Sequence, residues 1–78
     1  MDKQKALEWI TDVLAVNGRT LKLEDDRMSV VEWDSLGTLL LLSRLEEAYG
    51  ITISADQIAS INSIREICEL LEAHHAFE

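Results

Sequence analysis

Residues 34–50 read DSLGTLLLLSRLEEAYG, an aliphatic run that begins with a capping residue and ends with glycine. Asp34 is of a type preferred at helix N-caps, and Gly50 readily takes the left-handed conformation that ends a helix. The run therefore predicts the strongest helix of the chain, over residues 35–49.

The leucines of this run predict which face is buried. Leu41, Leu45 and Tyr49 recur at i, i+4 and i+8, and Leu42 widens the stripe, so these side chains are expected to turn toward a core. Leu39 and Leu40 cannot both join this narrow stripe, so we expect at least one of them to be exposed.

A second helix is predicted before this run. Apolar residues recur at helical spacing from Asp2 to about Val16, namely Ala6, Leu7, Ile10, Val13 and Leu14. Asn17-Gly18 accepts a left-handed backbone, so this helix is expected to stop there.

Two capping boxes follow Gly50. Ser54 with Gln57 predicts a brief helix through Ile58 and Ala59, and Ser63 with Glu66 predicts a last helix up to about His74. Ile64, Ile67, Cys68 and Leu71 form the apolar stripe of that last helix.

Residues 18–33 lack a helical period and predict a long loop, with a solvated turn at Glu24-Asp25-Asp26. Five apolar residues are expected to pin this loop to the helices: Leu21, Leu23, Met28, Val30 and Val31.

Composition agrees with this reading. The 78 residues are 47% hydrophobic but only 5% aromatic, with no proline and three glycines. We therefore expect an all-α fold in a single domain over residues 1–78. The expected fold is a small bundle of three principal helices plus one short helix, with a long loop between helices one and two.

The formal net charge of −8 disfavours nucleic acid and anionic membranes as partners and favours basic protein surfaces. No segment is apolar enough for membrane insertion. Cys68, the only cysteine, cannot form an internal disulfide or a zinc site, so we expect a cytoplasmic protein without a bound metal. We also expect a monomer.

Candidate catalytic residues are scarce. His74 and His75 are adjacent and point to different sides, which suits the C-terminal dipole of a helix better than a catalytic pair. Cys68 lies on the apolar stripe and is expected to be a small core residue. We expect no catalytic residues and a protein that is not an enzyme.

The remaining chemical feature is Trp33-Asp34-Ser35-Leu36, which puts a hydroxyl at the start of the strongest helix, just after a long loop. Taken alone, it is compatible with an ordinary helix start. However, Asp-Ser-Leu opening an aliphatic helix, followed by a short and then a final helix, resembles acyl carrier proteins. The resemblance is clearest from Val31 to Leu71.

This resemblance implies that Ser35 carries 4′-phosphopantetheine, transferred from coenzyme A. Asp34 would cap the helix and be recognised by the phosphopantetheinyl transferase. A phosphodiester on Ser35 would lie at the positive end of the helix dipole. The arm would hold acyl intermediates as thioesters, so we expect a discrete carrier protein.

The family also implies that partner enzymes dock along this helix. Gly37 and Leu40 stand where carriers of fatty acid biosynthesis are usually acidic, although Glu46 and Glu47 remain. We therefore expect docking through apolar contact at Leu36, Leu39 and Leu40. The expected partners are acyl-activating, ketosynthase or acyltransferase enzymes of a specialised polyketide or modified-acyl pathway.

Two alternatives stay open at the level of sequence. A peptidyl or aryl carrier of a nonribosomal-peptide pathway would use Ser35 in the same way. An unmodified acidic helical adaptor would use Asp34 and Ser35 only as a helix start and would bind a partner helix through its exposed leucines.

Overall fold

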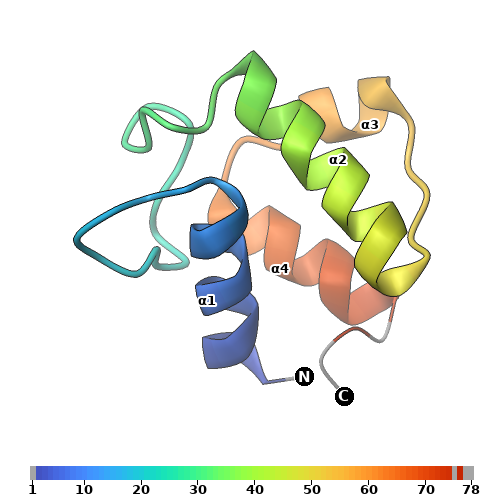
Figure 1. Cartoon of the computed structure of the whole chain (residues 1–78), viewed down its shortest axis with the longest axis horizontal. Coiled ribbons are helices and arrows are strands. Elements are labelled where there is room, and N and C mark those ends of the chain that lie inside the picture. The colour runs from blue at the N-terminus through green and yellow to red at the C-terminus, as the bar shows by residue number, and fades with distance from the viewer. Residues whose placement is uncertain (1, 75, 77–78) are drawn as a thin grey trace.

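The computed structural model describes residues 2–74 and 76 (Figure 1). Its helices are α1 (Lys3–Val13), α2 (Ser35–Tyr49), α3 (Ala55–Ala59) and α4 (Ile64–Ala73). α2 packs against α1 and α3, and α4 packs against α1. The predicted all-α class, with three principal helices, one short helix and a long loop, is confirmed.

Every helix and the long loop contribute aliphatic side chains to one core. The largest fully buried side chains are Ile10, Leu21, Val30, Leu41, Leu45, Ile58, Ile64, Ile67 and Leu71. Cys68 is also buried, which confirms its prediction as a small core residue. No polar or charged residue is buried within the described part of the chain.

The predicted core face of α2 is confirmed in its centre and wrong at its end. Leu41 and Leu45 are fully buried, and Leu42 is half-buried against the core. Tyr49 is instead 37% exposed and packs edge-to-face on Trp9 of α1, with ring centroids 5.4 Å apart. The last turn of α2 therefore lies at the margin of the core, where the Tyr49 ring packs against the Trp9 ring.

The first helix is shorter than predicted. α1 ends at Val13, because Ala15 takes a left-handed backbone conformation with φ of 57°. The Val16 and Ala15 amides donate to the carbonyls of Thr11 and Asp12, at 3.0 and 3.1 Å, which is a Schellman ending. The expected stop at Asn17-Gly18 is wrong, since this earlier turn leaves room for Leu21 to return to the core and donate its amide to Thr11 Oγ1.

Both predicted serine caps are present. Ser54 Oγ accepts from the Gln57 amide at 3.0 Å, and Ser63 Oγ accepts from the Glu66 amide at 3.2 Å. α3 ends at Ala59 as expected, and His74 is the C-cap of α4. His75 lies outside the described residues.

The loop of residues 14–34 lies to one side of the helices (Figure 1). Leu21 and Val30 are buried and Leu23 is half-buried, so these three pin the loop as predicted. The same expectation is wrong for Met28 and Val31, which are 93% and 85% exposed. Backbone hydrogen bonds also attach the loop to the α3–α4 link and to the start of α4: the Arg27 amide donates to Asn62 O, and the Ile64 amide donates to Asp25 O.

The acidic turn of this loop is more structured than predicted. Asp25 accepts hydrogen bonds from the Arg19 guanidinium at 2.9 Å and from the Lys22 amide at 2.7 Å. The carboxylate thereby closes the turn instead of only facing solvent. The structure also has no helix, among residues 2–74 and 76, that is long and apolar enough to span a bilayer.

Candidate functional site

The start of α2 is built by Asp34. Its backbone is extended, and its Oδ1 accepts from the Gly37 amide at 2.9 Å, which confirms Asp34 as the N-cap. The Asp34 carbonyl accepts from both the amide and the hydroxyl of Thr38. Ser35 is consequently the first helical residue, and its side chain is exposed.

Gly37 allows the loop to lie directly on this first turn. A Cβ atom there would meet the carbonyl oxygen of Glu32 at 2.5 Å and Leu14 Cδ2 at 3.0 Å. Only a residue without a side chain fits between the loop and α1. Position 37 is thus determined by packing, which accounts for the absence of an acidic residue there.

Trp33 and Arg27 support the same turn from the loop. Trp33, immediately before the cap, is only 3% exposed. The Arg27 guanidinium carbon lies 5.1 Å from the centre of the Trp33 ring, a cation–π distance. Arg27 Nε donates to Ile61 O at 2.8 Å and Nη2 to Ile58 O at 3.2 Å, so one side chain joins the loop, Trp33 and the end of α3.

A groove of about 330 Å³ opens beside Ser35 between α2 and α3. Its apolar lining comes from Leu39, Leu42, Ala55, Ile58 and Ala59, and its polar lining from Ser35, Thr38 and Arg27. A larger hollow of about 490 Å³ lies along α4 and includes no residue of α2. The hollow adjoining the candidate serine is therefore mainly apolar.

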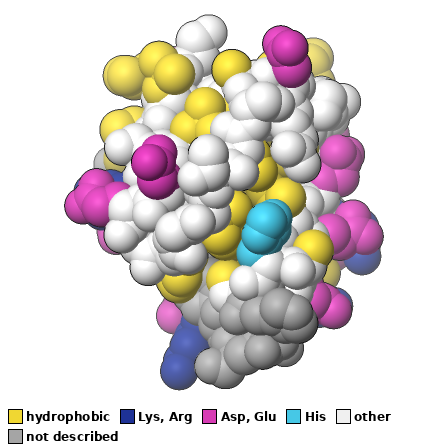
Figure 2. Space-filling model, turned by 90° about the vertical axis from the view of Figure 1, so that its right-hand side faces the viewer, with side chains coloured by type: hydrophobic (Ala, Val, Ile, Leu, Met, Phe, Trp, Pro, Cys, Tyr) yellow, Lys and Arg dark blue, Asp and Glu magenta, His cyan; other side chains and the backbone are white. Residues whose placement is uncertain are grey.

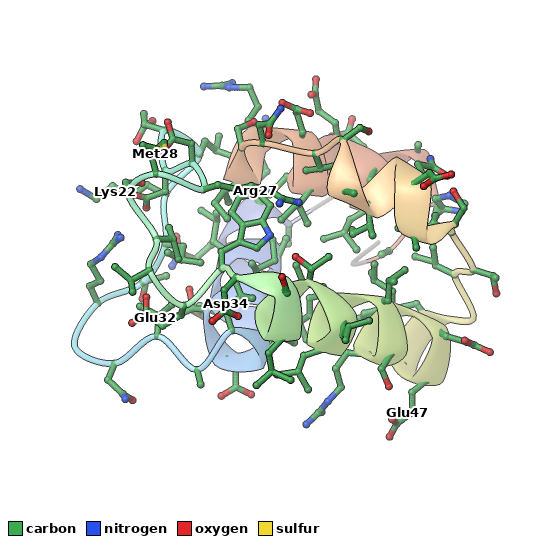
Figure 3. The ribbon with its side chains drawn as sticks, turned by 90° about the horizontal axis from the view of Figure 1, so that it is seen from above. Lys22, Arg27, Met28, Glu32, Asp34 and Glu47 are labelled. Carbon is green, nitrogen blue, oxygen red and sulfur yellow. The ribbon has the colours of Figure 1, made fainter. Side chains whose placement is uncertain are left out.

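The predicted docking residues lie in two groups. Leu36, Leu39 and Leu40 are 66%, 61% and 40% exposed in the first half of α2, next to Ser35. We call these three residues the apolar patch. Glu46 and Glu47 are exposed near the other end of the helix, and Figure 3 shows Glu47 far from Asp34 and Arg27.

Charged side chains are spread over the face of the molecule that Figure 2 shows. Figure 2 views the end of the molecule away from the long loop, where acidic side chains stand around the edge and hydrophobic side chains show between them. Within the described residues there is no group of three or more His, Cys, Asp or Glu placed to hold a metal ion.

Sequence reasoning missed Arg27. It lies in a segment without periodicity, and nothing in its neighbours along the chain predicts that it lines the groove with Ser35. Its contacts join residues 31 and 34 positions apart, so only the folded chain brings them together.

The structure thus places an exposed serine at the first residue of a capped helix, within a small acidic helical bundle. A family model described as "Phosphopantetheine attachment site" matches residues 4–71. The chain therefore belongs to the phosphopantetheine-binding acyl carrier protein family. The cofactor of this family is 4′-phosphopantetheine.

Relatives cover most of the chain. "Polyketide-8 synthase acyl carrier protein 2" of Streptomyces avermitilis is 32% identical over 71 residues, covering 91% of this chain and 82% of that protein. "Acyl carrier protein" of Phytoplasma mali is 25% identical over 71 residues, covering 91% and 84%. "Acyl carrier protein" of Trieres chinensis is 28% identical over 67 residues, covering 86% and 84%. No solved structure matches significantly.

Proposed function

We propose that Ser35 carries 4′-phosphopantetheine and that the chain, one carrier domain over residues 1–78, delivers acyl thioesters to enzymes without catalysing a reaction itself. The observation that carries this proposal is the exposed Ser35 hydroxyl at the first turn of α2, in an Asp-Ser-Leu sequence inside the family match. We place this carrier in the cytoplasm.

The residues around Ser35 fit the group. An exposed hydroxyl leaves space for a transferase, and a phosphodiester beside the N-terminus of α2 is favoured by the helix dipole. In loading, the Ser35 hydroxyl oxygen bonds to the phosphorus next to pantetheine in coenzyme A. The phosphoanhydride bond breaks, adenosine bisphosphate leaves and the hydroxyl loses its proton. The bound arm then supplies the thiol that forms the thioester.

The test is an intact-mass measurement after incubation with coenzyme A and a promiscuous phosphopantetheinyl transferase. Wild type should gain the mass of one arm, and Ser35→Ala should gain none. Ser43→Ala is the matched control, since Ser43 is exposed on the same helix, and it should load normally. Loading of Ser35→Ala, or an arm mapped to another residue, would overturn the proposal, and no loading of wild type would favour an unmodified adaptor.

Asp34 is proposed to serve both the cap and the transferase. Asp34→Ala removes the acceptor of the Gly37 amide and should cost about 1 kcal/mol of stability. Asp34→Asn retains a good cap without the charge. Slow loading of the Asn variant at near wild-type stability would support recognition of the carboxylate, whereas loading at the wild-type rate would limit Asp34 to the cap.

The apolar patch is proposed as the docking surface for enzymes of the pathway, with Glu46 and Glu47 contributing charge. Exposed aliphatic side chains that lie together on a small protein commonly mark an interaction site, and this patch adjoins Ser35. Leu40, at 40% exposure, is the least exposed of the three. Leu36 and Leu39 are therefore the better probes.

Leu36→Glu and Leu39→Glu should each change the free energy of unfolding by no more than a typical surface substitution, about 0.5 kcal/mol, but should slow acyl transfer to the cognate enzyme. Ala48→Glu adds the same charge at an exposed position in the last turn of α2 and should transfer normally. If Leu36→Glu and Leu39→Glu transfer at the same wild-type rate as this control, docking occurs elsewhere.

For the pathway, we propose polyketide or modified-acyl biosynthesis. The support is the name of the Streptomyces avermitilis relative, a polyketide synthase carrier, together with Leu40 in the first half of α2, at a position where carriers of fatty acid biosynthesis are usually acidic. The proposed partners are a phosphopantetheinyl transferase and the ketosynthase, acyltransferase or acyl-activating enzyme of that pathway.

A further inference from the structure

The chain around Ser35 is poor in basic residues. From Met28 to Ser43 it has two acidic residues, Glu32 and Asp34, and no lysine or arginine. Arg27, just before this stretch, is the only cationic residue that lines the groove with Ser35 in the described structure. Figure 3 shows Arg27 at the same end of α2 as Asp34. Arg27 is therefore the positive charge within this groove that an anion attached to Ser35 can meet.

The Arg27 side chain is held in place by the folded chain. Its Nε and Nη2 donate to the carbonyls of Ile61 and Ile58 at 2.8 and 3.2 Å, and its guanidinium lies over the Trp33 ring. The residue is also partly buried. A charge held in this way loses less side-chain entropy on meeting a partner, and is screened less by salt, than a freely exposed one.

This guanidinium has donors to spare. An arginine carries five N–H groups, and the two carbonyls occupy one on Nη2 and the one on Nε. Over residues 2–74 and 76, the structure gives Nη1 no hydrogen bond and Arg27 no carboxylate partner, although acidic residues outnumber Lys and Arg by 15 to 7. The described part of the unmodified chain thus leaves these donors without an acceptor.

The modification proposed at Ser35 brings a second anion to the first turn of α2. The Asp34 carboxylate already accepts from the Gly37 amide there, at 2.9 Å. The helix dipole attracts a phosphodiester as well, but it does not remove the repulsion between two negative charges in one turn. A guanidinium offsets that repulsion, and its planar set of donors matches the oxygens of a phosphate.

We propose, building on the attachment of the arm at Ser35, that Arg27 pairs with the phosphodiester of 4′-phosphopantetheine through its unused N–H groups. Ser35 holds the phosphate covalently, and Arg27 holds it on the side of α2 that faces α3. Arg27 is thus a positioning residue, which fixes the direction in which the arm leaves the helix. Because the contact is to the phosphate, it does not depend on what the thiol end of the arm carries.

If Arg27 only pinned the loop to α3, its removal would lower the stability of the unmodified and the loaded protein equally. Arg27→Met retains a stem of similar length without donors, and Arg27→Lys retains the charge without the planar fork. Arg44→Met is the matched control, because it removes the same charge from an exposed position of α2 that does not line the groove. The informative quantity is therefore the change in melting temperature on loading.

The first experiment loads Ser35 with the free arm, which bears no acyl group, from coenzyme A with a promiscuous transferase, and intact mass confirms loading. At low ionic strength, the change on loading should be more favourable by about 2–4 °C in wild type and Arg44→Met than in Arg27→Met. Arg27→Lys should retain part of this difference. In about 1 M salt, where the screening length is about 3 Å, the difference should shrink.

NMR tests whether the phosphate is the partner. The phosphorus resonance of the loaded arm should differ between Arg27→Met and wild type and should agree between Arg44→Met and wild type. In arginine-labelled wild type, where no variant needs to fold, the Arg27 Nε–H resonance should shift on loading. The resonances of Arg19, Arg44 and Arg65 should stay in place.

The pairing is wrong if loading changes the melting temperature of Arg27→Met and wild type equally, or if the Arg27 resonance does not move. A shifted Arg27 resonance with an unaltered phosphorus resonance would also contradict it, since the contact would then be to the pantetheine part of the arm. If wild type does not load, the attachment at Ser35 is wrong and the pairing with it, whereas loading without these differences counts only against Arg27.

Discussion

A Cβ atom at Gly37 would lie 2.5 Å from the carbonyl oxygen of Glu32. This distance is shorter than a van der Waals contact, so the loop backbone would have to shift. The loop before Ser35 thus rests directly on the first turn of the helix that Ser35 opens. A side chain at position 37 would push the loop away from Asp34, Trp33 and the groove.

Gly37→Ala should therefore destabilise the protein, although alanine is the better helix former by up to about 1 kcal/mol. Overpacking typically costs about 1–3 kcal/mol, so we expect a net loss of about 1–2 kcal/mol in urea unfolding. Ser43→Ala, at an exposed position of the same helix, should change stability by less than about 0.5 kcal/mol. If Gly37→Ala were as stable as wild type, the loop would not rest on this turn.

Ala15→Gly should stabilise the protein. Ala15 holds a left-handed conformation with φ of 57° at the end of α1, and this conformation costs an L-residue about 1–2 kcal/mol. Part of the gain is lost to the greater freedom of glycine in the unfolded chain, so we expect about 0.5–1 kcal/mol. Ala48→Gly, inside α2, should have the opposite sign, and a loss of stability in both variants would show that residue 15 is not left-handed.

Asp25 should make stability depend on acid pH. The hydrogen bond from Arg19 lowers the pKa of the Asp25 carboxyl in the folded state. Its contribution is therefore complete above the unfolded pKa of about 3.9 and is lost as the pH falls through the lower folded value. The stability difference between wild type and Asp25→Asn should be constant from about pH 7 to 5 and should shrink below about pH 4.

The partner of Asp25 can be tested in a double-mutant cycle. In an Arg19→Gln background, Asp25→Asn should cost less, because the largest cause of the lowered pKa is already absent. The same cost in both backgrounds would assign the effect to the Lys22 amide and Ser29 instead.

Cys68 should not interfere with detection of the arm. It is 2% exposed, and burial raises the pKa of its thiol, so little reactive thiolate is accessible at pH 7. We expect no thiol that reacts rapidly with a maleimide in the protein without the arm and one in the protein with it. Cys68→Ala should leave both counts unchanged. Rapid labelling of the protein without the arm would show that α4 opens readily.

Much of the fold can be predicted from local sequence because its signals are local. Asp34, Ser54 and Ser63 cap the helices that they were expected to cap, since a side-chain oxygen reaches an amide only three residues away. The buried stripe of Leu41 and Leu45 follows from helical periodicity in the same way.

The position at which α1 ends is not determined by local sequence. Asn17-Gly18 is the better stop signal, but the chain turns at Ala15, where the loop can return Leu21 to the core. Burial of an aliphatic side chain contributes about 1.5–3 kcal/mol, which is comparable to or larger than the strain at a left-handed alanine. Tertiary packing therefore overrides the local preference.

Some features of the candidate site likewise depend on local sequence, and others depend on tertiary packing. Sequence by itself determined that a hydroxyl opens the strongest helix, because a cap, a helix start and an exposed first residue depend on neighbours along the chain. Only the tertiary structure decided that Arg27 lies over Trp33 and lines the groove beside Ser35, and that Gly37 admits the loop. Those contacts join segments separated along the chain, and their energies arise when a guanidinium, an indole ring and the carbonyls at the end of α3 meet in the folded protein.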